Sequence, residues 1–395
     1  MTKSPLAAIS AGRARPPHSP RDRSPRGRYR MYTSYSGQRA LLNTAAKRNG
    51  ALAVLAVAVA LTFMMTDETL VLLSVGLAMA VGAIGLNLVT GYAGQISLGH
   101  AFFVGLGAYT ASALGGDPSS RDLGLGLDGL IWLPAAGLVA GLVGALLAPV
   151  AVRLRGLYLA IVTLGLVFIG VHLFRELTVV TGGAGIGRRG PDLVVLGVDL
   201  GVDRTVLGVP LTGEQATYLC ILVVLLVMAI GARNLVRSRI GRAFAAVRDR
   251  DLAAEPMGIN LFRVKMVAFA VSSAYAGTAG ALLATVSGYV EPSGFGLLMS
   301  IQFLAMILLG GLATISGSIA GALFITFLPR LTQSVAEVLP FMDHRGNGSG
   351  LLSAFQLEQI LYGLLIVVFV VAEPAGLVGI WNRIRTYWRS FPFSY

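Results

Sequence analysis

Charged side chains are scarce in this sequence. Only 13% of its 395 residues are Asp, Glu, Lys or Arg, whereas a soluble domain has about 25%. A helix needs roughly 20 apolar residues to cross a bilayer. Seven stretches that lack all four charged residue types can each hold one crossing, and the two longest can hold two. This excludes a water-soluble fold. The stretches are residues 49–66, 69–116, 129–152, 156–174, 215–232, 266–290 and 292–329.

The sequence also lacks the motifs of common catalytic sites. Its three lysines are Lys3, Lys47 and Lys265, and none follows a glycine. There is therefore no Gly-Lys-Ser/Thr loop to hold a nucleotide phosphate, and we expect the chain not to be an ATPase. Neither a nucleophile elbow nor a His/Cys cluster with metal-ligand spacing is present. The single cysteine, Cys220, cannot form an intrachain disulfide. We predict no enzymatic activity, no metal and no cofactor of its own.

The charges that are present separate into basic and acidic loops. Residues 1–48 carry 11 basic residues against one acidic residue, and residues 233–265 carry eight against three. Lys and Arg accumulate in cytoplasmic loops. We therefore predict a disordered cytoplasmic tail over 1–48, a transmembrane domain over 49–376 with a large cytoplasmic loop at 233–265, and a cytoplasmic tail over 377–395. A basic tail of this kind can also touch nucleic acid or anionic lipid, but we favour a role in orienting the chain, without specific nucleic-acid binding.

Glycine and polar residues interrupt two of the apolar stretches. We expect about 8–10 spanning helices in an all-α bundle, with residues 292–329 forming two helices or a re-entrant broken pair. Broken backbone at membrane depth survives only against protein or a water-filled cavity, so both interruptions are candidates for the substrate path. The alternative is helix packing through small residues. The first interruption contains Gly91, Gly94, Gln95, Ser97 and His100, and the second contains Gly310, Gly311, Thr314, Ser316 and Gly317.

His100 is the only His, Asp, Glu, Lys or Arg within residues 69–116. Ionisable side chains inside the membrane often mark transport pathways. Buried imidazoles, however, are most often hydrogen-bonded groups of the core. Both interpretations of His100 stay open at this point.

The large basic loop predicts a short amphipathic helix. Over residues 241–254, Phe244 and Val247 are apolar, whereas Arg242 and Arg248 are polar. Pro256 and Gly258 then end the helix or turn the chain. A basic loop can rest on anionic lipid. The small residues that follow favour a docking helix for a cytoplasmic partner, because they permit close approach.

Residues 252–258 resemble the coupling segment of ATP-binding-cassette (ABC) importer permeases, whose pattern is Glu-Ala-Ala, three residues, then Gly. Ala253, Ala254 and Gly258 fit this pattern, and Leu252 stands where Glu is expected. Further segments are similar to the branched-chain amino acid permease family, which imports leucine, isoleucine and valine. They occur in the family's order, at residues 85–100, 101–109, 156–165, 181–186 and 253–260.

This resemblance implies a permease subunit in the bacterial plasma membrane, with both termini cytoplasmic. Its partners would be a homologous permease subunit, two cytoplasmic ATPases that bind ATP, an extracytoplasmic solute-binding protein and membrane lipid. The substrate-path residues would be Gly91, Gly94, Gln95, Ser97, His100, Tyr109, Tyr158, Thr163, Thr181, Gly182, Gly183, Gly310, Gly311 and Thr314. The ATPase-coupling residues would be Arg242, Arg248, Ala253, Ala254, Glu255 and Gly258.

Two other functions remain open. A permease of the same family can carry urea or short amides, and no residue identifies the substrate side chain. An ion-coupled secondary transporter or channel would work without ATP. Such proteins often carry an intramembrane carboxylate, and the near absence of one here weighs against that class.

Overall fold

A computed structural model of the chain describes residues 45–117, 123–154, 156–183, 185, 187–206, 209–338, 342–343, 352–373 and 375–390. Of the predicted N-terminal tail, only the last four residues fall within these ranges, where they begin the first described helix. The remainder of that tail lies outside the described residues.

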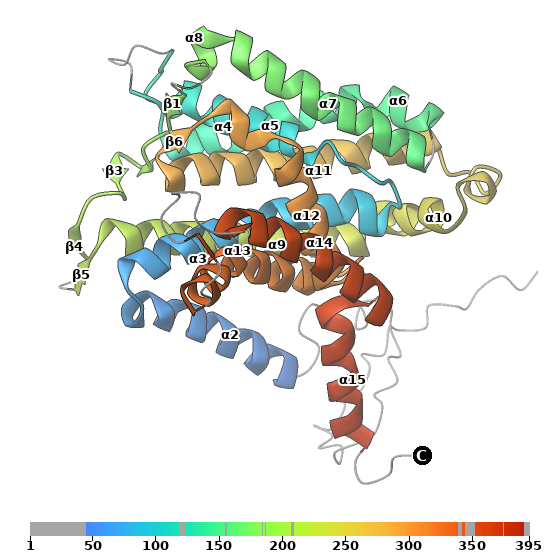
Figure 1. The fold of residues 1–395 in the computed structure, drawn as a ribbon. Coiled ribbons are helices and arrows are strands. Elements are labelled where there is room, and N and C mark those ends of the chain that lie inside the picture. The colour runs from blue at the N-terminus through green and yellow to red at the C-terminus, as the bar shows by residue number, and fades with distance from the viewer. Residues whose placement is uncertain are drawn as a thin grey trace, which may run out of the picture.

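Long helices make up most of the described chain (Figure 1). Six are long and apolar enough to cross a membrane: Asp67–Tyr92, Gly129–Leu146, Leu157–Glu176, Gly213–Arg237, Leu261–Ser287 and Ile315–Thr332. Three further apolar helices are shorter: Arg48–Met64, Leu297–Gly310 and Gln359–Phe369. These findings confirm the predicted polytopic all-α bundle.

The helices follow one another with few long connections. They are α2 (Ala45–Met64), α3 (Asp67–Asn87), η1 (Leu88–Tyr92), α4 (His100–Gly115), α5 (Gly129–Leu146), α6 (Ala148–Arg153), α7 (Leu157–Glu176), α8 (Thr178–Thr181), α9 (Gly213–Arg237), α10 (Arg239–Ala254), α11 (Leu261–Ser287), η2 (Pro292–Phe295), α12 (Leu297–Gly310), α13 (Ile315–Val338), α14 (Ala354–Ala372) and α15 (Gly376–Ser390). The described part of the predicted C-terminal tail is thus helical.

Polar residues fix where several helices begin. The Thr212 hydroxyl accepts a hydrogen bond from the Gln215 amide, and the Gln215 side chain accepts one from the Thr212 amide, which makes a capping box at α9. Asn260 caps α11 by accepting from the Arg263 amide at 3.0 Å. Asp128 caps α5 and also accepts from the Gly197 amide. These backbone hydrogen bonds, that from Leu130 first, lower the pKa of the Asp128 carboxyl.

Helices α3 and α11 form the centre of the bundle, and most of each spanning stretch is buried. Helix α4 lies against α11 at very short range. A Cβ atom at Gly107 would overlap the Gly277 backbone, and one at Gly280 would overlap the Val104 carbonyl oxygen. Glycine is therefore required at this crossing, since small residues let helix backbones approach closely in a membrane.

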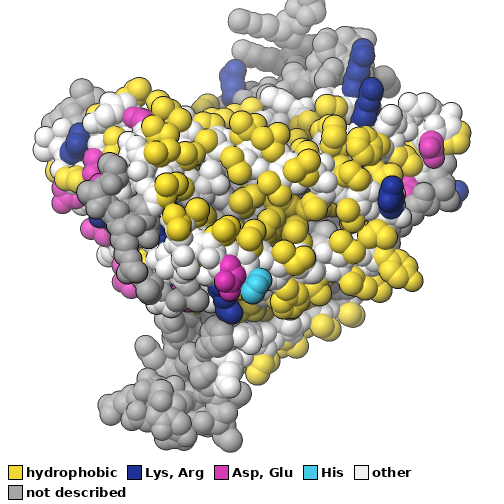
Figure 2. Space-filling model, turned by 90° about the horizontal axis from the view of Figure 1, so that it is seen from above, with side chains coloured by type: hydrophobic (Ala, Val, Ile, Leu, Met, Phe, Trp, Pro, Cys, Tyr) yellow, Lys and Arg dark blue, Asp and Glu magenta, His cyan; other side chains and the backbone are white. Residues whose placement is uncertain are grey.

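The outer helices present an apolar surface. Figure 2 shows hydrophobic side chains covering much of one face, with most of the charged side chains toward its edges. On α7 the exposed residues include Leu157, Ile161, Phe168 and Ile169. Lipid is the solvent that matches a surface of this kind.

Short strand pairs and the helix α10 lie at opposite ends of the bundle (Figure 1), which we call the strand end and the α10 end. At the strand end, β1 (Arg188–Arg189) pairs with β6 (Tyr289–Val290), β2 (Val194–Val195) with β3 (Val198–Asp199), and β4 (Arg204–Val206) with β5 (Val209–Leu211). A further pair joins β7 (Met342–Asp343) and β8 (Leu352–Ser353).

A buried arginine holds the strand end together. The Arg188 guanidinium donates to the carbonyl oxygens of Val180, Ser112 and Leu123. Its side chain thereby joins α8, the end of α4 and the loop before α5. Charge-assisted bonds to three carbonyls offset the cost of burying this cation.

We predict that Gly280→Ala lowers the stability of the purified chain by about 1–3 kcal/mol, because the added methyl group overpacks the α4–α11 crossing. Gly165→Ala is the matched control, since a Cβ atom at Gly165 meets nothing within 4 Å. Thermal unfolding in detergent measures both variants. Equal stability of the two would contradict the close crossing.

Candidate functional site

The first predicted interruption is a real break between two helices. Helix α3 continues into the π-helical turn η1, and the chain then leaves helical geometry until α4 begins at His100. Gln95 and Ser97 are buried in this segment, and Gly94 has φ +69°. Single π turns inside helices occur frequently at functional sites. The break therefore alternates buried residues with exposed ones, such as Gly94 and Ile96.

The second predicted interruption is also a break. Helix α12 ends at Gly310 and α13 begins at Ile315. Between them Gly311 has φ +122° and Ala313 has φ +56°. The Thr314 hydroxyl donates to the Gly311 carbonyl oxygen at 2.7 Å, which closes the turn. The structure thus shows two helices joined by a tight turn, and α12, with 14 residues, is shorter than the six helices long enough to cross a membrane.

One side chain, Asn87, connects the two breaks. Its amide nitrogen donates to the Thr314 carbonyl oxygen at 3.0 Å and to the Ser318 hydroxyl at 2.7 Å. Its amide oxygen accepts from the Ala313 backbone N–H at 2.8 Å. A Cβ atom at Gly91 would overlap the Asn87 amide oxygen. Segments more than 200 residues apart in sequence thus form a single hydrogen-bonded unit.

The predicted coupling helix reaches the same unit. The Arg248 guanidinium of α10 donates to the Gly91 carbonyl oxygen at 3.1 Å. A Cβ atom at Gly94 would lie 2.7 Å from the Arg248 side chain. We call the set Asn87, Gly91, Gly94, Arg248 and residues 311–314 the junction. It joins the coupling helix to both breaks.

Sequence reasoning identified most of the junction but missed Asn87. It named Gly91, Gly94, Gly311 and Thr314 for one role and Arg248 for another, without placing them together. A signal for Asn87 was present, because a carboxamide in an uncharged apolar stretch must find hydrogen-bond partners inside the protein.

Helix α10 confirms the predicted amphipathic segment, with Phe244 and Val247 buried against the bundle. Its backbone departs from helical angles at Arg250, where φ is −158° and ψ is 99°. Arg242, Ala253, Glu255 and Gly258 are exposed, whereas Ala254 is buried. Gly258 has φ +83°, a backbone conformation that favours glycine. The space around it is open.

His100 is buried at the start of α4. Its Nε2 lies 2.9 Å from the Gly82 carbonyl oxygen, and its ring meets the Phe303 ring edge-on at 4.9 Å. These are the contacts of a hydrogen-bonded core group.

Tyr109 lies deeper in α4, among aromatic rings. Its ring centroid is 5.0 Å from that of Phe174 and 5.8 Å from that of Phe295. The Tyr109 hydroxyl has no hydrogen-bond partner among the described residues. Burying a hydroxyl without a hydrogen-bond partner costs free energy, so Tyr109 is not explained by the stability of the aromatic cluster alone.

The remaining predicted path residues lie in three other places. The Thr163 hydroxyl of α7 accepts from the Leu98 amide at 3.0 Å and so fixes the first break to α7. Tyr158 is 73% exposed on the outside of α7. Thr181 is buried at the strand end, where its hydroxyl donates to the Phe174 carbonyl oxygen. The next two residues in the chain, Gly182 and Gly183, both have positive φ. The structure therefore does not bring all the predicted path residues together.

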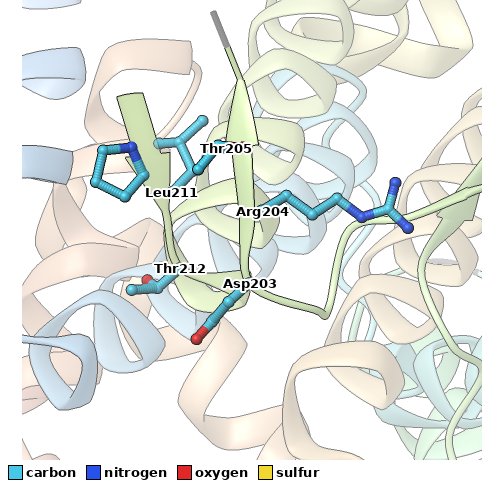
Figure 3. Close-up of a pocket in the computed structure, with 6 residues that line it drawn as sticks. Asp203, Arg204, Thr205, Leu211 and Thr212 are labelled. Carbon is cyan, nitrogen blue, oxygen red and sulfur yellow. The ribbon is translucent and has the colours of Figure 1, made fainter. Parts of the chain in front are cut away.

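Two surface pockets accompany these features, and neither is lined by a predicted path residue. The larger, of about 560 Å³, lies beside the β4–β5 hairpin (Figure 3). Its Asp203 carboxylate accepts from the Gly213 amide, and its Thr212 hydroxyl donates to Asp67. These polar groups hold the start of α9. The smaller pocket, of about 360 Å³, lies between α7 and η2, beside His172, Arg175 and Ser293.

Comparison with known proteins identifies a family. The family described as branched-chain amino acid transport system / permease component matches residues 68–370. The high-affinity branched-chain amino acid transport system permease protein LivM of Salmonella typhimurium is 30% identical over 341 residues, 83% of this chain and 74% of LivM. LivM of Escherichia coli is 30% identical over 342 residues, 82% of this chain and 73% of LivM.

A second kind of permease matches a shorter part. LivH of Salmonella typhimurium is 31% identical over 142 residues, 36% of this chain and 40% of LivH. No solved structure matches the chain. The family match spans both breaks and α10, and the chain belongs to the permease components of branched-chain amino acid transport systems.

Proposed function

We propose that this chain is one membrane subunit of an ATP-driven importer for branched-chain amino acids in the bacterial plasma membrane. A homologous permease, two cytoplasmic ATPases and an external solute-binding protein would complete the transporter. The observation that carries this proposal is the contact between the coupling helix α10 and the first break, through Arg248 and Gly91. This contact supplies a physical connection between an ATPase-docking surface and the helices of the permease.

The partners are supported by the relatives. Two different permease proteins, LivM and LivH, carry the name of the same transport system in Salmonella typhimurium. A transporter with two unlike permease subunits is the arrangement that these names support. We propose that this chain takes the LivM position, because its similarity to LivM extends over most of both chains.

The orientation follows from the charges. Eight basic residues fall within 233–265, which includes α10, and loops of this kind stay in the cytoplasm. We therefore assign the α10 end to the cytoplasm and the strand end to the outside. Arg188 then stabilises the surface on which an external solute-binding protein would dock.

The junction suggests how ATP-driven motion reaches the helices. Movement of α10 would act on the Gly91 carbonyl through Arg248, and Asn87 would transmit it to the turn between α12 and α13. Binding energy can shift a conformational equilibrium only through contacts that differ between the two states. The hydrogen bonds of the junction are the contacts that we expect to change.

The uptake of labelled leucine tests the proposed function. We expect the chain to restore uptake in a strain that lacks its native importer, provided that its permease partner, ATPases and binding protein are expressed with it. In proteoliposomes, transport should require the ATPases and ATP. Uptake of urea alone would contradict the substrate, and transport without any ATPase would contradict the class of transporter.

We predict that Gly258→Trp weakens co-purification of the ATPases while leaving membrane insertion intact, because a bulky side chain would obstruct docking at the exposed turn after α10. Any replacement at φ +83° also carries backbone strain. Gly258→Asn is the matched control, since Asn tolerates positive φ. Co-purification of the Trp variant at the level of the Asn variant would count against docking at this turn.

We predict that Arg248→Ala keeps the ATPases bound but raises the ATP hydrolysed per substrate imported severalfold, because the hydrogen bond to the first break is lost. Arg239→Ala is the control, as this arginine is exposed at the start of the same helix. Hydrolysis and uptake are measured together in proteoliposomes. A coupling ratio equal to that of the control would argue against the junction as the transmission route.

A further inference from the structure

The C-terminal helix α15 exposes apolar and aromatic side chains on one face. Ile380, Trp381, Ile384 and Tyr387 recur at helical spacing and are 38%, 65%, 46% and 61% exposed. Asn382, Arg385 and Thr386 occupy the other positions around the helix. Since residues three and four apart share a helix face, α15 is amphipathic, and its apolar stripe is exposed.

The start of this helix is joined to the α10 end of the bundle, whereas residues 380–387 are exposed. Only three residues separate it from α14, and the Gly376 amide donates to the Glu373 carbonyl oxygen at 2.8 Å. An ion pair of 2.8 Å joins Arg383 to Glu373. A Cβ atom at Gly311 would lie 2.7 Å from the Ala375 carbonyl oxygen. The start of α15 thus packs beside the junction.

The direction of α15 differs from that of the spanning helices. Figure 1 shows α15 running across the direction of the long helices rather than alongside them. Its 15 residues give a length of roughly 22 Å. Because α14 is apolar and ends directly before the turn, this direction is the one expected of a helix that lies along a membrane surface.

The composition of the exposed stripe favours one kind of partner. Trp and Tyr concentrate at membrane–water interfaces, where their rings have both apolar and polar surroundings. A helix with such a face and basic residues lies in the interface plane, with its apolar side among the acyl chains and headgroups. Arg385 is exposed next to this stripe and matches the negative charge of anionic headgroups.

We propose that α15 is an interfacial helix that binds the anionic lipid surface of the cytoplasmic leaflet. Ile380, Trp381, Ile384 and Tyr387 insert at the headgroup boundary, and Arg385 contacts lipid phosphates. Because α15 begins beside Gly311, the lipid surface then holds the α12–α13 turn in place while α10 moves. This role goes beyond the proposed transport function and does not depend on the substrate.

Site-directed spin labelling tests the proposal on the full chain. Cys220→Ala removes the single native cysteine, and Ile384→Cys or Asn382→Cys then places a label on the apolar or the polar face. Both positions are exposed, so labelling disturbs little packing. The labelled chain is reconstituted in phosphatidylcholine vesicles with and without phosphatidylglycerol. Accessibility to oxygen, which partitions into lipid, is compared with accessibility to a water-soluble nickel complex.

We expect the oxygen-to-nickel accessibility ratio to be severalfold higher at residue 384 than at residue 382, and the difference to increase with phosphatidylglycerol. Equal ratios at the two positions would overturn the proposal. Protection of residue 384 that develops only when the ATPases are added would also overturn it, because α15 would then be a protein-docking surface. Arg385→Glu should remove the dependence on phosphatidylglycerol, and a dependence that persists would contradict the proposed phosphate contact.

Discussion

The carboxamide of Asn87, at the end of α3, hydrogen-bonds to the backbone of the turn between α12 and α13. Its oxygen accepts from the Ala313 amide and its nitrogen donates to the Thr314 carbonyl oxygen. In a membrane protein, every backbone polar group away from water must find a partner within the protein. The Ala313 amide in this turn therefore finds its partner in a side chain from another helix. The position of α13 relative to α3 depends on the same bonds.

The close approach of backbones has a related cause. Little hydrophobic driving force operates between helices that are already surrounded by lipid, so association depends on packing and on hydrogen bonds. The crossing of α4 and α11 uses glycines for packing, as at Gly280 against Val104. The junction depends on both packing and hydrogen bonds. Gly91 leaves room for the amide of Asn87, and its carbonyl oxygen accepts a hydrogen bond from Arg248. Glycine is thus a structural requirement at specific contacts of this bundle.

The two ends of the bundle are built differently. At the strand end, Arg188 donates to three carbonyl oxygens, and β1 pairs with β6 across a long sequence separation. That end is held by three hydrogen bonds from one buried cation and by the strand pairing. At the other end, α10 is joined to the bundle through the Arg248 hydrogen bond and the buried side chains of Phe244 and Val247. A small number of contacts can be exchanged between two conformations more readily than a dense network. This difference suits a fixed strand end and a movable α10.

The sequence by itself was sufficient to predict that the helices lie in a lipid bilayer. It also predicted the all-α class, the approximate helix positions and both breaks. Each follows from local composition, because the length of an apolar stretch and the presence of glycine are properties of neighbouring residues. Only the tertiary structure decided that Asn87 joins the two breaks and that Arg248 reaches Gly91. The exposure of Tyr158 and the burial of Ala254 also required it. Such contacts depend on which helix faces meet, and an apolar stretch that is hydrophobic on all sides does not specify its neighbour.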